Sequence, residues 1–140
     1  MRISLQKTIL LFLVTCILYV VVGYSVEACN VQRVNNAVSN LRMLGRAIQD
    51  YRKRSGSYPH SDSIDGLCKE IAFDSSKLHS FASPQFCEVI YLKPQDCSMD
   101  CEVAKCATKN LMRFFSLKRY YIEMTLFSDA TVTTNIVYVN

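Results

Sequence analysis

An apolar run that passes directly into a long helical stripe constrains this chain more than any other feature of its sequence. The run extends from Thr8 to Val22. The stripe then recurs in steps of three or four residues, which places its members on one side of a helix. Gly56-Ser57-Tyr58-Pro59 marks its end, because glycine caps helix C-termini and the residue before proline favours extended backbone. We interpret the stripe as a helix-packing or assembly face, and it comprises Val31, Val34, Val38, Leu41, Leu44, Ile48 and Tyr51.

The N-terminal segment has two interpretations. Arg2 and Lys7 flank the start of the apolar stretch, as they do in signal peptides and in membrane anchors with a cytoplasmic N-terminus. The stretch from Thr8 to Tyr24 approaches the roughly 17 to 25 residues that cross a bilayer, and it exceeds the roughly 7 to 15 of a signal-peptide core. Cleavage after Ser25 or Ala28 is the alternative. Because the stripe resumes directly after Ala28, we favour one continuous helix whose first half lies in the membrane.

The chain of 140 residues has room for one small domain behind this segment. We divide it into a membrane anchor or signal-like segment at residues 1–25, the exposed half of a long amphipathic helix at residues 26–56, and a cysteine-rich domain at residues 57–140. The formal net charge of +4 is mildly basic, and it is not by itself typical of nucleic-acid-binding proteins.

Six of the seven cysteines follow the leading segment, whereas Cys16 lies inside the apolar run. An even number of cysteines in an exported chain indicates disulfides that support a small core, and the spacing leaves their pairing open. A metal site built from the last three, or buried thiols, is the alternative. The disulfide candidates are Cys29, Cys68, Cys87, Cys97, Cys101 and Cys106.

The C-terminal domain shows a mixed pattern. Apolar residues predict a short helix over residues 64–71, a loop over 74–83 and a strand over 87–92. We predict a second amphipathic helix over residues 98–117, with Ser98 as its candidate cap, because its apolar positions again step by three and four.

Alternating residues at the C-terminus predict a hairpin of two strands, over 120–127 and 131–139, with Ser128-Asp129 at the turn. The sequence therefore predicts an α+β fold. In it, the long N-terminal helix packs on a small antiparallel β-sheet, one or two short helices accompany the sheet, and disulfides support the domain.

Two features of the long helix have alternative interpretations. Gly45 interrupts the helical pattern, either as a tolerated surface glycine or as a point where a neighbouring helix comes close. The polar face carries a basic stripe, which is either a solvated surface or a contact for DNA or anionic lipid. No aromatic residues are interleaved with this stripe, which argues against DNA. The basic residues are Arg33, Arg42, Arg46, Arg52 and Lys53.

The sequence offers little support for catalysis. His60 and His79 are its only histidines, the glutamates show no paired arrangement, and no glycine-rich phosphate loop is present. A histidine acting with Cys68 or Cys87 as the nucleophile of a small exported enzyme is the remaining alternative. We therefore predict no enzymatic activity, and we assign no catalytic, cofactor-binding or metal-ligating residue.

The exposed half of the long helix and the residues after it carry a family resemblance. The matching segments are Ala37-Val38-Ser39-Asn40-Leu41, Leu44, Ala47-Ile48, Tyr51, Tyr58-Pro59 and Gly66-Leu67. This pattern resembles the major pseudopilin of bacterial type II secretion and other type IV pilin-like proteins, although the prepilin peptidase motif is missing. The resemblance implies that Tyr58, Pro59, Gly66 and Leu67 form the family motif, where the helix turns back toward the domain.

The resemblance further implies a structural subunit of a type II secretion or type IV pilus-type assembly, with a role in protein transport. Its single span would cross the bacterial inner membrane with the N-terminus in the cytoplasm and the domain in the periplasm. Its partners would be the membrane and other pilin-like subunits or secretion-machine components. The alternative is a secreted, disulfide-rich interaction module or effector whose signal peptide is removed.

Overall fold

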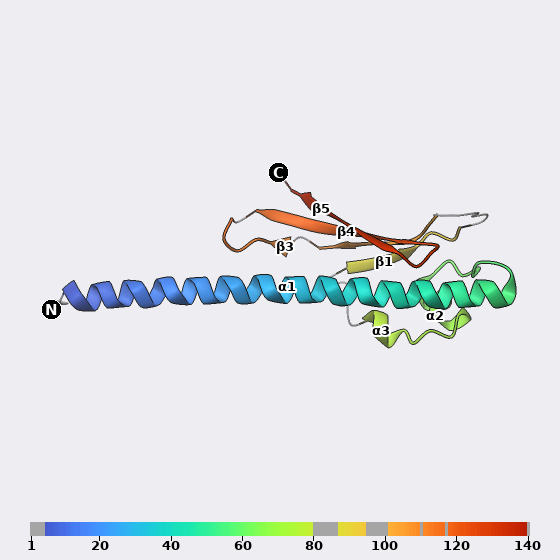
Figure 1. Ribbon diagram of the computed structural model, residues 1–140, viewed down its shortest axis with the longest axis horizontal. Helices are drawn as coiled ribbons and strands as arrows, with labels where there is room; N and C mark the ends of the chain where they lie inside the picture. Colours follow the sequence, from blue (N-terminus) through green and yellow to red (C-terminus); the bar gives the residue numbers. More distant parts are fainter. Residues whose placement is uncertain (1–4, 80–86, 95–100, 110, 117, 140) are drawn as a thin grey trace.

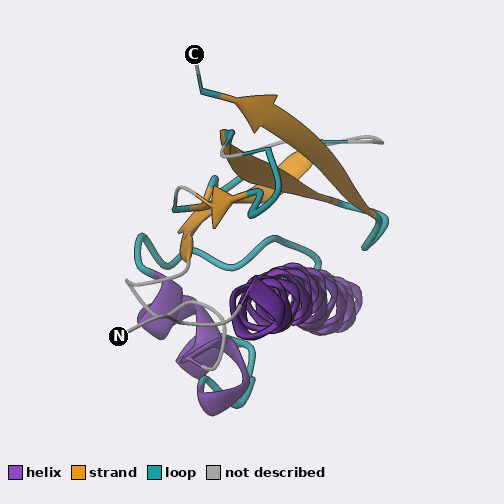
Figure 2. Cartoon of the chain, turned by 90° about the vertical axis from the view of Figure 1, so that its left-hand side faces the viewer, coloured by secondary structure: helices purple, strands orange, loops and turns teal. Residues whose placement is uncertain are grey.

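The computed structural model describes residues 5–79, 87–94, 101–109, 111–116 and 118–139. One helix, α1 (Leu5–Ser55), runs the whole length of the molecule, and a small antiparallel sheet lies along its C-terminal part (Figure 1). Viewed along α1, the sheet covers one side of the helix and two short helices lie on another (Figure 2). The predicted combination of one long helix with a small antiparallel sheet is confirmed.

The long helix is uninterrupted and ends where the sequence predicts. Gly56 adopts φ of +79°, and its N–H donates to the carbonyl of Arg52 at 2.8 Å. This is the left-handed cap that glycine supplies at a helix C-terminus. Basic residues in the last turn, Arg52 to Arg54, lie beside the negative end of the helix dipole. The interpretation of the apolar run and the stripe as one continuous helix is confirmed.

The first short helix is α2 (Ile64–Glu70), as predicted. Ser63 caps it, because the Ser63 hydroxyl accepts a hydrogen bond from the N–H of Gly66 at 3.1 Å. The second, α3 (Ser76–His79), forms inside the segment predicted to be a loop. The Asp74 carboxylate accepts from the N–H of Ser76 at 3.0 Å, which satisfies a backbone donor at the start of this single turn.

The sheet is antiparallel throughout. Strand β2 pairs with β1 and β4, β5 pairs with the other edge of β4, and the short β3 pairs with the start of β4. The predicted strand after residue 86 and the predicted C-terminal hairpin are both confirmed. The strands are β1 (Cys87–Tyr91), β2 (Glu102–Thr108), β3 (Leu111–Met112), β4 (Arg119–Phe127) and β5 (Val132–Tyr138).

The prediction of a second amphipathic helix over residues 98–117 is wrong, since β2 and β3 occupy this segment. In β2 the buried residues Ala104, Cys106 and Thr108 alternate with the exposed Lys105 and Ala107. This period of two suits a strand with one face on the core. The proposed cap, Ser98, lies outside the described residues.

The core fills the space between α1, the sheet and α2. Leu41, Leu44 and Ile48 of α1 are 0 to 2 % exposed, and they belong to the same buried cluster as Met124 and Leu126 of β4. Gly45 is also buried, because the turn between β4 and β5 lies against it. The interpretation as a surface glycine is therefore wrong. A neighbour does come close, as in the other interpretation, but it is a hairpin turn and not a helix.

The predicted disulfide framework of six cysteines is also wrong. Cys29, Cys68 and Cys106 carry thiols, and the last two are buried in the apolar core, where cysteine packs as a small hydrophobic residue. Cys101 is disulfide-bonded, whereas Cys97 and the side chain of Cys87 lie outside the described residues. Support for the described domain therefore comes mainly from packing between the helix and the sheet.

Candidate functional site

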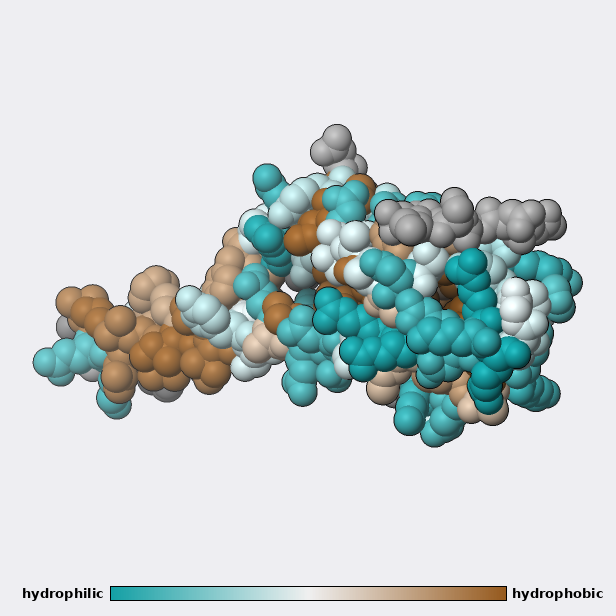
Figure 3. Space-filling model, turned by 45° about the vertical axis from the view of Figure 1, so that its right-hand side comes forward, coloured by the Kyte–Doolittle hydropathy of each residue, from teal (hydrophilic) through white to brown (hydrophobic). Residues whose placement is uncertain are grey.

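The first half of α1 projects from the domain as an exposed apolar rod. Its large apolar side chains between Leu5 and Val26 are 40 to 76 % exposed. Figure 3 shows this apolar end standing clear of a largely hydrophilic body. Among the described residues, α1 is the one helix long and apolar enough to cross a membrane, a criterion that a signal sequence would also meet. Exposed apolar surface of this extent marks a contact with lipid or protein.

The few polar groups of this rod are satisfied within the helix. The hydroxyl of Thr15 donates to the carbonyl of Leu11 at 2.8 Å, and the hydroxyl of Ser25 donates to the carbonyl of Val21 at 2.8 Å. Side-chain hydroxyls that bond back to the preceding turn need no water. The rod therefore presents a nearly uniform apolar surface from Ile9 to Val22, with Gln6 and Lys7 ahead of it.

An aromatic contact marks the place where this rod reaches the domain. Phe114 and Phe115, from the connection between β3 and β4, pack over Gly23 of α1, where an added Cβ would lie 2.5 Å from Phe114 Cδ1. Tyr19 and Tyr24 complete the cluster, with ring centroids 4.8 Å from Phe114 and 5.4 Å from Phe115, respectively. The sequence analysis did not predict this contact. The signal that could have indicated a close approach was a glycine, Gly23, between Tyr19 and Tyr24 on an apolar helix.

The helical stripe serves mostly the chain's own core. Leu41, Leu44 and Ile48 are buried under the sheet, and Tyr51 packs against the same cluster. Val31, at the other end, is 60 % exposed. The C-terminal part of the predicted assembly face is therefore buried in the chain's own core, whereas its N-terminal end and the apolar rod are exposed. The other two members, Val34 and Val38, are partly buried.

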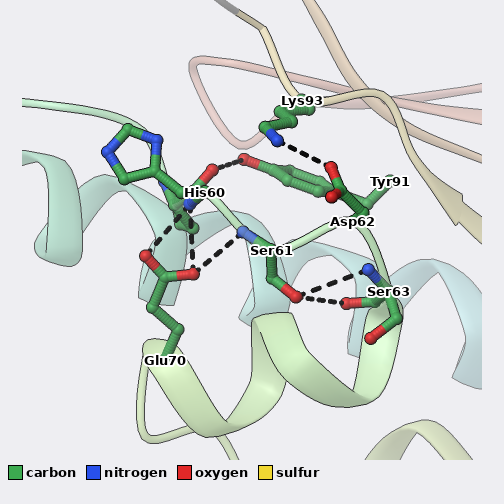
Figure 4. Close-up of polar contacts among 8 residues, drawn as sticks. His60, Ser61, Asp62, Ser63, Glu70, Tyr91 and Lys93 are labelled. Carbon is green, nitrogen blue, oxygen red and sulfur yellow. Dashed lines mark hydrogen bonds and ion pairs between the residues drawn. The ribbon is translucent and has the colours of Figure 1, made fainter.

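Polar contacts hold the segment between α1 and α2, which follows the predicted motif residues Tyr58 and Pro59 (Figure 4). The carboxylate of Glu70, at the end of α2, accepts hydrogen bonds from the backbone N–H of His60 at 3.0 and 3.1 Å and of Ser61 at 3.0 Å. It also accepts from the hydroxyl of Tyr51 at 2.9 Å. These donors favour the charged form, so the pKa of Glu70 is lowered, chiefly by the N–H of His60.

The turn itself is held from both sides. The hydroxyl of Tyr91 donates to the carbonyl of Pro59 at 3.1 Å, and burial raises the pKa of Tyr91, which keeps it a donor. The guanidinium of Arg52 lies 4.6 Å from the ring centroid of Tyr58 and donates to its hydroxyl at 2.9 Å. Tyr58 is 8 % exposed, so this ring forms part of the core.

Gly66 and Leu67, the other residues of the predicted motif, lie at the same corner. Leu67 is fully buried, and a Cβ on Gly66 would collide with the hydroxyl of Ser61. An exposed ion pair joins Lys93 and Asp62 across the turn at 2.6 Å (Figure 4). The corner is thus a rigid joint between helix and domain. Within the described ranges, no group of three or more histidine, cysteine or acidic side chains is arranged to hold a metal.

The basic stripe faces outward. Arg33, Arg42, Arg46 and Lys53 are exposed on α1.

Comparison of the chain with known proteins found no relative: no protein-family model, curated protein or solved structure matches it. The resemblance to pilin-like proteins therefore stays a prediction from the sequence.

Proposed function

We propose that this chain is a structural, pilin-like subunit that α1 anchors in a bacterial inner membrane, with its domain in the periplasm. It would work in a type II secretion or type IV pilus-type assembly, and not as an enzyme. The observation that carries the proposal is the unbroken helix of 51 residues, apolar and exposed in its first half and built into the domain core in its second.

The exposed rod requires a partner. Burial of apolar surface is worth about 25 cal/mol for each Å² removed from water, so an uncovered rod would be strongly unfavourable. From Leu5 to Tyr24 the helix rises about 28 Å, close to the roughly 30 Å of a bilayer's hydrocarbon core. Lipid would cover the rod before assembly, and the rods of neighbouring subunits would cover it within a filament.

The domain is joined to the rod without a hinge. Leu41, Leu44 and Ile48 belong to the same helix as the rod and lie in the core of the domain. The Glu70 and Tyr91 contacts then fix the corner where α1 ends. A force on the domain would therefore be transmitted to the rod, which suits a structural subunit.

The decisive experiment is expression of the full chain in a bacterium, followed by membrane fractionation and intact-mass analysis. The anchored subunit should resist carbonate extraction and retain the residues ahead of Gly23. A soluble product that starts near Val26 or Cys29 would overturn the proposal and support a secreted interaction module with a cleaved signal peptide.

Assembly can be tested with the native thiol of Cys16, which is exposed on the apolar rod. In a Cys29→Ser background, oxidation of membranes should produce a Cys16-linked dimer if rods bundle side by side. The Cys16→Ser variant in the same background is the matched control and should give none. A dimer that persists in this control would show that crosslinking does not report on the rod.

A further inference from the structure

We propose that the loop between β3 and β4 enters the lipid headgroup region beside α1, so that the domain rests directly on the bilayer surface. The partner of this loop is the phosphate-bearing interface of an anionic membrane. The inference rests on the proposed function, because it assumes that the first half of α1 spans that membrane.

The first argument is one of depth. Tyr19 and Tyr24 are five residues apart on α1, so they differ by about 7 to 8 Å along the helix axis. Phe114 packs on Tyr19, and Phe115 lies 6.2 Å from Tyr19 and 5.4 Å from Tyr24 between ring centroids. If Tyr24 marks the end of the span, Tyr19 lies inside it. A loop that touches both tyrosines must then reach the same depth.

The second argument is the chemistry of the cluster. Tyrosine and other amphipathic aromatic residues concentrate at the boundary between hydrocarbon and headgroups. Phe115 remains 45 % exposed after packing on α1, so a large apolar edge still needs cover. Gly23 allows the loop this close approach, because any side chain there would occupy the space of Phe114 and Phe115.

The third argument is charge. Arg113, Lys118 and Arg119 flank the two phenylalanines, and all three are exposed. Glu27 of α1 lines the same pocket as Arg113 and Phe115, so the three cations outnumber the one nearby carboxylate. The N–H of Arg113 donates to the carbonyl of Lys118 at 3.0 Å, which closes the loop and brings the cations to one end of the sheet. Figure 1 shows this end of β3 and β4 overhanging α1 on the side of its N-terminus.

Lipid fits this surface better than a second copy of the chain. Cations above an apolar edge match phosphates above acyl chains, and basic residues near an anionic surface are attracted to it. Two copies that met through the same loop would place like charges together. The loop also continues the apolar surface of the rod, which the proposed function already assigns to lipid.

The absence of tryptophan from the sequence makes a direct test available. The Phe115→Trp variant of the full chain is reconstituted in vesicles of phosphatidylcholine and phosphatidylglycerol that contain lipids spin-labelled near the headgroup. We expect blue-shifted emission and about twofold or stronger quenching, as for a residue at the membrane interface. The Ile90→Trp variant, on an exposed position of β1, is the matched control and should show water-like emission and little quenching.

The charge contribution is measured with Lys118→Gln/Arg119→Gln in the Phe115→Trp background. With these cations present, quenching should be stronger in vesicles that contain phosphatidylglycerol than in vesicles of phosphatidylcholine alone. Removal of the cations should abolish this difference. An unchanged preference for phosphatidylglycerol would overturn the role of these cations. If circular dichroism shows that Phe115→Trp alters the fold, Ser116→Trp on the same exposed loop replaces it.

Two outcomes separate this inference from the proposed function. If the chain sediments with vesicles but the Trp at position 115 is not quenched, the loop does not reach the lipid and the inference is wrong, whereas the anchor stands. Blue-shifted emission without quenching would show that protein covers the loop, with the same consequence. If the chain does not associate with vesicles at all, both the inference and the proposed function fall.

Discussion

Gly45 of α1 lies directly against Ala130 in the turn between β4 and β5: a Cβ on Gly45 would be 3.0 Å from the Cβ of Ala130 and 2.8 Å from Cδ1 of Leu126. A hydrogen bond from the same helix holds the turn beside this contact. The side-chain amide of Gln49 donates to the carbonyl of Ser128 at 2.8 Å, and Ala130 itself has φ of 63°. The missing side chain therefore sets how closely the hairpin approaches the helix.

We predict that Gly45→Val lowers the free energy of unfolding by about 1 to 3 kcal/mol, the usual cost of overpacking a filled site. Leu126 is fully buried, and the backbone Cα of Ala130 would lie 3.1 Å from the first added carbon, so neither neighbour moves aside without cost. Thermal unfolding of the full chain in detergent, followed by circular dichroism, measures the loss.

Arg42→Val is the matched control, because Arg42 is exposed on the same helix. It should cost no more than about 0.7 kcal/mol, the range of helix propensities among ordinary residues. Equal effects of the two substitutions would show that the contact between helix and turn is loose.

The Glu70 carboxylate gives the corner a pH dependence. Its pKa is lowered in the folded chain, so its contribution is fully present above the pKa of the unfolded chain and is lost as the pH falls through the folded value. We predict that the wild-type chain loses stability as the solution is acidified below about pH 5. The Glu70→Gln variant should be destabilised by about 1 to 2 kcal/mol at pH 7, and the difference should shrink at pH 3.

Thermal melts of both chains at pH 7 and pH 3 measure this convergence. Glu88→Gln, on the exposed face of β1, is the control and should change the stability at pH 7 by no more than about 0.5 kcal/mol. A constant difference between wild type and Glu70→Gln at both pH values would mean that the hydrogen-bonded carboxylate does not stabilise the corner.

The thiols should react according to their burial. Cys29 is exposed, whereas Cys68 is buried and its pKa is raised, chiefly by desolvation. Because the thiolate is the nucleophile, Cys68 should react slowly. We predict that maleimide labels Cys29 in the native chain. It should label Cys68 only after denaturation, and no reductant should be needed. Peptide mapping by mass spectrometry assigns the labels, and a Cys68 that needs reductant would show a disulfide.

The parts of the fold that the sequence predicted are those with a sustained pattern. The stripe of α1 keeps its period of 3.6 over several turns, and the hairpin strands alternate cleanly. In β2 the pattern is broken by an irregular register between Glu102 and Ala104. Val103 and Ala104 are therefore both buried, which breaks the strand alternation. The apolar spacing of the segment then resembled that of a helix.

Contacts between distant segments were not predictable in this way. Nothing local to Phe114 and Phe115 indicates that they pack on Gly23, and nothing local to Glu70 indicates that it binds the backbone of His60. The burial of Cys68 and Cys106 likewise depends on how closely α1 approaches the sheet. A count of cysteines reports redox chemistry only when their separations in the fold are known.

The membrane assignment yields the sharpest functional prediction. Val14 lies near the middle of the apolar rod and is 45 % exposed. An arginine at the centre of a spanning helix costs about 2.5 to 3.5 kcal/mol in membrane insertion, so Val14→Arg should reduce the carbonate-resistant fraction severalfold. Gln32→Arg, on the exposed polar part of α1, adds the same charge outside the span and should leave this fraction unchanged. Because the charge is the same in both variants, a loss of the carbonate-resistant fraction in both would indicate general misfolding. An unchanged fraction in both would show that the rod does not span the bilayer.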